Sequence, residues 1–501
     1  MFFRLLVIAI GPLAVVATAL PVRSQEARPD VTTPAATQRT GDLLSRQHTL
    51  ALPDRSLSYT ATMGTLPLVD DKGAAIAHVF FTSYTSGEGG GSRPVLFVFN
   101  GGPGASSAFL HLGGLGPRIV PFDTQGAVAR EPVHTVDNPD SWLTFADLVF
   151  VDPVGTGFSR VAGNEDAAAR FYGVDKDADA MAAFVRTYLN RFGRTAHPVF
   201  VAGASYGAFR STLVAQRLAK SGFDVRGAVL IAPALDFSVI WGPSITLLPA
   251  ALALPSIACS ELERRVGVEA DISACEATEA FARGPYLLHL AAGARDNEAI
   301  NSEVARLTGL PLSEVARRFA RITAGDYARA FQRANDRVLS LYDGSFSRAV
   351  PRAADGHSPD PLLDHSVVVL GPAFVAYARD HVGYTSDLPF HLLNREVRAK
   401  WDFGTSPQRQ GFASALDELQ ELRTQRPRFR VLVASGLTDL VTPFAAARFM
   451  VDQLRTIAGA VPVEVRTYRG GHMMYLRAPT RQRLAADARA LVAAALEEAA
   501  P

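Results

Sequence analysis

A serine lies between two glycines in the segment Val199-Phe-Val-Ala-Gly-Ala-Ser-Tyr-Gly207. The four apolar residues at its start predict a short buried strand, and residues 208–220 after it have helical spacing. A sharp turn from strand to helix strains its corner residue, and the small neighbours Gly203 and Gly207 allow such a turn to close. Ser205 would then lie at a helix N-terminus, where free N–H groups and the helix dipole favour a developing negative charge. The pattern predicts a nucleophilic serine, with an ordinary loop as the alternative.

A serine nucleophile needs a base within hydrogen-bond reach, and the base needs a carboxylate to orient it. After a strand–serine–helix turn of this kind, the acid and then the histidine follow along the chain. Asp439 lies in the turn after the apolar run 431–436, and His472, the only histidine downstream of it, follows the predicted strand 463–466. Residues at the carboxyl ends of parallel strands gather at one edge of a sheet. We therefore predict a triad of Ser205, Asp439 and His472; a turn-forming aspartate and a surface-loop histidine are the alternatives.

A glycine-rich segment, Asn100-Gly-Gly-Pro-Gly104, follows another apolar run at residues 95–99. Glycine lets a substrate approach the backbone closely, so this segment can offer N–H groups to the oxyanion of a tetrahedral intermediate. The N–H of Tyr206, directly after the nucleophile, is the expected second donor. A phosphate-binding loop is the alternative, but no Gly-Lys-Ser/Thr sequence follows, so that alternative fails.

These residues depend on a series of strands and helices for their positions. Apolar runs typical of buried strands occupy residues 95–99, 148–151, 199–202, 228–232, 431–434 and, less purely, 463–466. Helical patterns occupy residues 176–190, 208–220, 443–457 and 480–499. Buried strands that alternate with helices predict a largely parallel sheet covered on both faces. Two further strands are expected upstream, at residues 56–62 and 74–85.

The alternation stops between residues 237 and 400, where leucine- and alanine-rich segments with helical spacing dominate, among them 302–320 and 326–341. We predict an α/β core formed by residues 48–236 and 401–501, with a helical insertion over residues 237–400. A separate helical domain with its own role is the alternative.

The N-terminus is typical of an exported protein. Residues 1–24 contain a basic start at Arg4, an apolar stretch over 5–19 and small residues suited to cleavage. A membrane anchor is the alternative, but about 15 apolar residues fall short of the ~20 that a span requires. We expect a cleaved signal peptide, a mobile leader over residues 25–47, no stable membrane span, and a periplasmic or secreted location.

Composition excludes some classes of protein and predicts one covalent link. The chain has 50 basic and 49 acidic residues, so no overall charge recruits nucleic acid. Cys259 and Cys275 are its two cysteines, and in an exported chain such a pair predicts one disulfide, worth about 3 kcal/mol by loop entropy. Two buried free thiols are the alternative. No cluster of His or Cys has metal-ligand spacing, so we expect neither metal nor cofactor.

Taken together, the motifs resemble those of the serine carboxypeptidase family. The matching residues are Asn100-Gly-Gly-Pro-Gly-Ala-Ser-Ser107, Gly116-Pro117, Asn138, Ser141-Trp142, Pro153-Val-Gly-Thr-Gly-Phe-Ser159, Gly203, Ser205-Tyr-Gly207, Gly436, Asp439 and Gly471-His-Met473. The resemblance implies an α/β-hydrolase fold, with a mostly parallel sheet, helices on both faces and a helical insertion (cap) domain. It implies Ser205, Asp439 and His472 as the catalytic triad, Gly102 and Tyr206 as the oxyanion hole, and Asn100 as a substrate-binding residue.

Three positions depart from the family pattern. Ala204 stands where a glutamate usually precedes the nucleophile, and Gly114 stands where a second glutamate lies two residues before the Gly-Pro pair. In the family these acids and the asparagine of the Asn-Gly-Gly motif bind the terminal carboxylate of the substrate through a shared proton that favours acidic pH. Here only Asn100 remains. The third departure is Val151, two residues before Pro153, where the family usually has aspartate.

We therefore expect an exported serine-type carboxypeptidase that cleaves peptide bonds near the C-terminus through an acyl-enzyme on Ser205. Its partner is a peptide or small acyl substrate and not nucleic acid. An esterase or acyltransferase with the same triad is the second hypothesis. A binding protein on an inactive hydrolase scaffold is the third, and an intact Ser, Asp and His in order argues against it. The sequence indicates neither the oligomeric state nor the preferred side chain.

Overall fold

The computed structural model describes residues 43–88, 93–124, 126–127, 133–242, 245–267, 271–293, 295–349, 360–404 and 413–497. The signal peptide predicted for residues 1–24 lies outside these ranges, as does most of the predicted leader. One correction concerns the end of that leader, because residues 44–47 already belong to strand β1 (Leu44–Ala51). They pair antiparallel with β2 (Ser56–Val69), from Leu44 opposite Met63 onward. The sheet therefore begins four residues before the predicted start of the core.

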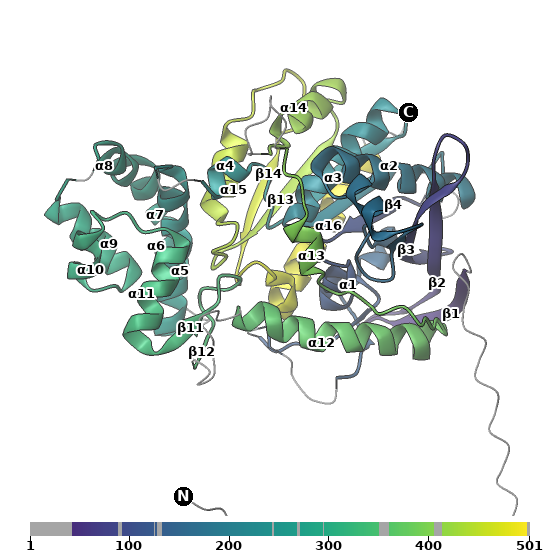
Figure 1. Ribbon diagram of the computed structural model, residues 1–501, viewed down its shortest axis with the longest axis horizontal. Helices are drawn as coiled ribbons and strands as arrows, with labels where there is room; N and C mark the ends of the chain where they lie inside the picture. The colour runs from purple at the N-terminus through teal and green to yellow at the C-terminus, as the bar shows by residue number, and fades with distance from the viewer. Residues whose placement is uncertain are drawn as a thin grey trace, which may run out of the picture. The chain divides into compact units, whose positions relative to one another are not determined.

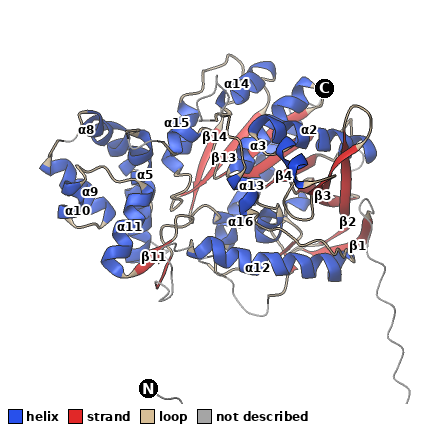
Figure 2. Cartoon of the chain, in the orientation of Figure 1, coloured by secondary structure: helices blue, strands red, loops and turns tan. Residues whose placement is uncertain are grey.

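A central sheet runs through the described part of the chain (Figures 1 and 2). Its strand order is β1-β2-β3-β7-β4-β9-β10-β13-β14, with β8 paired to β3. The remaining strands are β3 (Ala75–Ser86), β4 (Val95–Phe99), β7 (Asp147–Val151), β8 (Arg160–Val161), β9 (Val199–Ala204), β10 (Val225–Ile231), β13 (Arg430–Gly436) and β14 (Glu464–Tyr468). From β7 to β14 neighbouring strands are parallel, whereas β1, β2, β3 and β8 pair antiparallel.

Both faces of the parallel strands are buried, as their nearly continuous apolar sequences predict. Side chains alternate between the faces, so Phe97 and Val201 belong to one hydrophobic cluster while Leu96 and Phe200 belong to the other. Helices α2 (Val174–Arg191), α3 (Tyr206–Lys220), α14 (Leu416–Gln425) and α15 (Phe444–Asp452) pack in the first cluster. Helices α1 (Ala108–Leu110), α12 (Pro361–Tyr377) and α16 (Ala478–Glu497) pack in the second. The sheet is thus the middle layer of three, and the predicted α/β architecture is confirmed.

The segment between β10 and β13 is mostly helical, as its sequence predicts. It contains α4 (Phe237–Ile240), α5 (Leu248–Val266), α6 (Ser273–Glu276), α7 (Thr278–Phe281), α8 (Leu287–Ala291), α9 (Glu298–Thr308), α10 (Leu312–Arg317), α11 (Ala324–Asn335), α12 and α13 (Arg395–Ala399). Figure 1 shows α8 to α11 grouped beside α5. Two small hairpins, β5 (Arg118–Ile119) with β6 (Val136–Asp137) and β11 (Arg337–Leu339) with β12 (Ser347–Ala349), lie off the main sheet.

Two helical predictions in this segment need correction. The pattern at 302–320 is not one helix, because Gly309 ends α9 in a left-handed conformation (φ 65°) and Pro311 precedes α10. The pattern at 326–341 also ends early, since Asp336 adopts a left-handed conformation (φ 50°) and the chain continues as β11. Helical spacing persisted across both breaks because the flanking segments bury apolar residues in one cluster.

One helical stretch among the described residues, Pro361–Val382, is long and apolar enough to cross a membrane by length and composition. Half of its most apolar stretch is buried inside the protein. Leu370 and Phe374 pack in the hydrophobic cluster beneath the sheet, so this helix has a role in the core of the fold.

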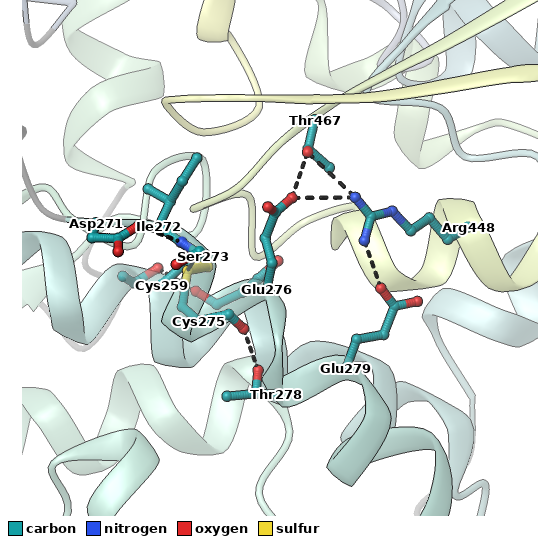
Figure 3. Close-up of a disulfide and its surroundings, with 12 residues drawn as sticks. Cys259, Asp271, Ile272, Ser273, Cys275, Glu276, Thr278, Glu279, Arg448 and Thr467 are labelled. Carbon is teal, nitrogen blue, oxygen red and sulfur yellow. Dashed lines mark hydrogen bonds and ion pairs between the residues drawn. A yellow bond between two sulfur atoms is a disulfide. The ribbon is translucent and has the colours of Figure 1, made fainter.

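A disulfide joins Cys259 on α5 to Cys275 on α6, with a Cα–Cα distance of 5.0 Å (Figure 3). Next to it, Glu276 accepts a hydrogen bond from Thr467 of β14 (2.6 Å) and pairs with Arg448 of α15. The Arg448 guanidinium also pairs with Glu279 of α7 (2.7 Å). The disulfide therefore stiffens the part of the helical segment that is bonded to the sheet and its covering helix.

We expect the disulfide to form in protein purified from an oxidising compartment. Alkylation without reductant should add no mass to the intact protein, whereas alkylation after reduction and unfolding should add two groups. Two added groups in the unreduced sample would contradict the assignment. Cys259→Ser/Cys275→Ser should lower the free energy of unfolding by about 3 kcal/mol.

Candidate active site

Ser205 lies at the corner between strand β9 and helix α3 and has φ 60° and ψ −125°. A positive φ is costly for a residue with a side chain and persists only where the surrounding structure imposes it. The cause here is close backbone packing, because a Cβ added at Gly203 would lie 2.1 Å from the Gly207 carbonyl oxygen. The glycines that flank Ser205 therefore make the turn possible, as the sequence predicts. Ser205 is partly exposed, whereas its neighbours on both sides are buried.

The glycine-rich loop after β4 lies directly against this corner. A Cβ at Gly101 would lie 2.8 Å from the Tyr206 backbone nitrogen and 2.9 Å from the Ser205 Cβ. A Cβ at Gly207 would lie 2.3 Å from the Phe99 carbonyl oxygen. Gly102, with φ 104°, has a conformation that favours glycine. The predicted oxyanion donors, the N–H groups of Gly102 and Tyr206, thus lie on two segments in backbone contact.

A buried ion pair fixes the two segments to each other. Arg210, on the second turn of α3, donates a short hydrogen bond to the Asn100 carbonyl. The same guanidinium donates through Nε to Asp177 of α2 over 2.6 Å. Both charged side chains are nearly inaccessible to solvent, so the pair is sheltered from water and salt.

Asp439 and His472 meet past the ends of β13 and β14, as their places in the sequence predict. The Nδ1 atom of His472 lies 2.7 Å from Oδ2 of Asp439, and the aspartate is fully buried. The other carboxylate oxygen of Asp439 accepts the backbone N–H groups of Val441 (2.8 Å) and Thr442 (2.9 Å). Since Nδ1 is bonded to the carboxylate, Nε2 is the ring nitrogen left to exchange a proton with a serine.

Thr442 is a site residue that the motifs did not reveal. Its hydroxyl lies 2.7 Å from Oδ2 of Asp439, 3.1 Å from Nδ1 of His472 and 3.0 Å from the Ala232 carbonyl oxygen. It therefore holds the acid and the base against the end of β10. The sequence signal was slight, a threonine three residues after the candidate acid.

The segment between β10 and β13 also contributes residues that contact the acid and base loops of the site. The Tyr342 carbonyl accepts the His472 backbone N–H (2.6 Å), and the Tyr342 ring stands edge-on to the imidazole with centroids 5.1 Å apart. On either side, Leu341 accepts from the Leu440 N–H (3.0 Å) and Gly344 donates to the Thr438 carbonyl (2.8 Å). We call residues 341–344 the strap, because they bond to the loops that carry Asp439 and His472.

Hydrogen bonds and ion pairs of buried charged side chains hold the strap in place. Asp343 accepts hydrogen bonds from Thr438 Oγ1 and from Arg477 Nη2, each over 2.7 Å. Arg477 in turn bonds to Glu263 of α5 (2.7 Å). These three ionic side chains are at most 9% exposed, so they link the segment between β10 and β13 to the His472 loop through a network sheltered from water.

A small cavity opens beside Ser205 and His472. Its other lining residues are Asn100, Gly102, Ala105, Phe109, Ala204, Tyr342, Leu363, Leu393, Met473 and Tyr475. Asn100 supplies a polar side chain that is 91% buried and whose Oδ1 has no hydrogen-bond partner. Among the residues that the structure describes, the lining includes no lysine or arginine. The cavity therefore offers a substrate a mostly apolar wall with one amide oxygen, Asn100 Oδ1, that has no partner among the described residues.

The three positions that depart from the family pattern, Ala204, Gly114 and Val151, have different surroundings in the structure. Ala204 lines the cavity, and Gly114 lies against Tyr475, whose Cβ would be 3.2 Å from a Cβ added at Gly114. An aromatic ring thus fills the space beside Gly114. Next to Val151, Asp152 is buried and accepts hydrogen bonds from the Ser107 N–H (2.7 Å) and Ser106 Oγ (2.9 Å). Burial raises the pKa of Asp152 to about 7, although those two bonds oppose the rise.

The described part of the chain contains no cluster of side chains that could bind a metal ion. Within those residues no group of three or more His, Cys, Asp or Glu side chains could hold a metal ion.

The order of the strands, the helices on both faces and the position of Ser205 after a central strand define an α/β-hydrolase fold. Residues 63–225 match the family model of the serine carboxypeptidases, so this part of the chain is related to that family. The match contains Asn100, Gly102, Ser205 and Tyr206, and it ends before Asp439 and His472.

Curated relatives and a solved structure agree with this family. The chain is 34% identical over 166 residues to the pheromone-processing carboxypeptidase KEX1 of Lachancea thermotolerans, covering 30% of this chain and 20% of the relative. It is 30% identical over 210 residues to carboxypeptidase Y of Schizosaccharomyces pombe, covering 38% and 19%. The matched segments thus span about a fifth of these relatives' length. The crystal structure of a prohormone-processing carboxypeptidase from Saccharomyces cerevisiae, KEX1(delta)P, is similar with a TM-score of 0.53 and 15% identity, covering 90% of this chain and 96% of that one, and it supports the fold.

We predict that Thr442 positions the acid and the base. Thr442→Val keeps the shape of the side chain and removes the hydroxyl, so kcat should fall about 10-fold while KM changes less than about 2-fold. Thr442→Ser, which keeps the hydroxyl, is the matched control and should retain most of the activity. If valine and serine at this position give the same kcat, the hydroxyl has no positioning role.

Proposed function

We propose that the protein is a serine carboxypeptidase-like hydrolase that cleaves peptide bonds near the C-terminus through an acyl-enzyme on Ser205. The observation that carries the proposal is the 2.7 Å bond between His472 and Asp439 beside a cavity that Ser205 also lines. The family match over the segment that contains Ser205 supports the choice of peptide substrates.

In this mechanism Ser205 Oγ attacks the scissile carbonyl while Nε2 of His472 takes its proton. The carbonyl oxygen becomes an oxyanion, which the N–H groups of Gly102 and Tyr206 stabilise. Collapse of the intermediate breaks the C–N bond, and the imidazolium returns the proton to the leaving amine. Water then repeats the sequence on the acyl-enzyme and releases the acid product. Asp439 holds the imidazole in the required tautomer and stabilises its charged form.

An esterase or acyltransferase is the alternative activity, because the same acyl-enzyme can form from an ester or pass to an amine or alcohol. A peptide with a free carboxylate, the same peptide with a blocked end and a simple ester separate these activities. A peptidase of the proposed kind cleaves the free-carboxylate peptide with the highest kcat/KM of the three.

We also propose that the protein is exported to the periplasm or secreted, and that residues 237–400 form a helical insertion in the α/β core. The basic and apolar start of the chain and the disulfide support export. N-terminal sequencing of protein from the periplasm or medium tests the location. A chain that still begins at Met1 in the cytoplasm would refute it.

Ser205→Ala should abolish turnover and change stability little, because the side chain lines the cavity and is partly exposed. Loss of a triad nucleophile typically costs ~10⁴-fold or more, so more than ~1% residual activity would contradict the assignment. His472→Ala should be about as damaging and Asp439→Asn less so. Covalent labelling by a fluorophosphonate, present in the wild type and absent in Ser205→Ala, is the independent check.

The pH dependence should follow the histidine. An imidazole must be neutral to accept a proton, and histidines ordinarily titrate near pH 6.5. Two carboxylates that share a proton would add an acid optimum, but Ala204 and Gly114 remove them. We expect kcat/KM on a free-carboxylate peptide to fall in acid, because a protonated base cannot accept the serine proton, and to stay high at neutral and mildly alkaline pH. A maximum at about pH 4 to 5 would mean that other acids replace the missing pair.

A further inference from the structure

Arg398 is an exposed cation at the edge of the candidate active site. It lies on α13, and its Nη1 donates to the Gly102 carbonyl over 2.8 Å. Its guanidinium also lies over the ring of Trp241, 5.7 Å from the centroid. A guanidinium has five N–H donors, so one bond to a carbonyl and one aromatic contact leave several donors for a ligand.

The neighbouring arginine provides a contrast. Arg395, one turn earlier on α13, forms an ion pair with Asp364 of α12 (2.8 Å). Arg398 forms no ion pair with any carboxylate of the described residues. Of the two arginines on this face of α13, Arg398 therefore has the positive charge that is not neutralised by the described part of the protein.

Arg398 touches the cavity wall at Gly102 and is not itself one of the lining residues. Gly102, which accepts its hydrogen bond, lines the cavity next to Ser205. Tyr342 lies on the cavity wall as well, and burial raises its pKa to about 12 against the opposing effect of Arg398 and Arg395. The guanidinium is thus close to Gly102 and Tyr342, two residues of the wall that a substrate would touch.

A terminal carboxylate needs such a charge here. An anion that enters an apolar cavity without a cation or several hydrogen-bond donors loses much of its solvation energy. Among the described residues the cavity wall offers the Asn100 amide and no lysine or arginine, and Ala204 and Gly114 stand where the family has the two acids that share a proton with the ligand. Asn100 lies two residues before Gly102, whose carbonyl accepts the hydrogen bond from Arg398.

We propose that Arg398 binds the terminal carboxylate of the substrate, together with Asn100. The proposal rests on the proposed function, because it names the feature by which that activity would select chain ends. A guanidinium is always charged in proteins, so recognition of a carboxylate by an arginine imposes no acid optimum. Arg398 would thus replace a proton-dependent contact with a permanent one.

Binding can be measured without turnover in the full exported chain carrying Ser205→Ala. The probes are an N-blocked Phe-Leu dipeptide with a free carboxylate and the same dipeptide with a C-terminal amide, each titrated by calorimetry. We expect the acid to bind about 10-fold more tightly than the amide, and Ser205→Ala/Arg398→Gln to lose this preference. Arg398→Lys should retain part of it. Arg395→Gln in the same background is the matched control and should retain all of it.

The ratio of the two affinities, and not either alone, decides the outcome. If Arg398→Gln weakens both probes equally, the side chain acts only through the Gly102 loop and the proposal is wrong. Acid binding no tighter than amide binding, including no detectable binding of either, also overturns it. Wild-type protein that binds the acid through Arg398 yet never cleaves it would refute the proposed peptidase activity and leave the carboxylate site standing.

Discussion

The contact between two stretches of backbone, the loop after β4 and the turn after β9, is the constraint on which the site depends. Cβ atoms at Gly101 and Gly207 would lie 2.6 Å and 2.3 Å from carbonyl oxygens across this contact, and a Cβ at Gly203 would lie 2.1 Å from a carbonyl oxygen within the turn itself. Such distances are impossible for real side chains, so any larger residue would push the loops apart. The Arg210 guanidinium bonds to the Asn100 carbonyl in the loop after β4 and to Asp177 of α2, and these bonds stabilise the contact. The nucleophile and both predicted oxyanion donors take their positions from this one arrangement.

Much of this could be predicted from the sequence because the signals are local. The apolar runs at 95–99 and 199–202 correspond closely to β4 and β9, since parallel strands buried on both faces have few positions for polar residues. Asp439 and His472 could be selected because each follows such a strand. Their 2.7 Å contact is a consequence of β13 and β14 lying side by side in parallel.

Other features have no local signal. Helical spacing continued past Pro311 and Asn335 because the segments on both sides face one core, and only the break in the backbone separates them. Tyr342 and Arg398 reach the site from loops and a short helix that carry no recognisable pattern. Their positions depend on how the whole segment between β10 and β13 packs, and a tertiary property of that kind cannot be obtained from spacing alone.

The position of the strap, residues 341–344, in the sequence determines the order in which the parts of the site can form during synthesis. Ser205 and the glycine-rich loop are synthesised before the strap, whereas Asp439 and His472 are synthesised after it. The loops that carry the acid and the base each bond to the strap backbone, so their final geometry depends on the folded segment between β10 and β13. A chain emerging from the ribosome or an export channel would therefore carry its nucleophile without a working base. The proposed hydrolase would be inactive during its own synthesis and would become active when its last segment folds. It would not require a separate inhibitory peptide for this.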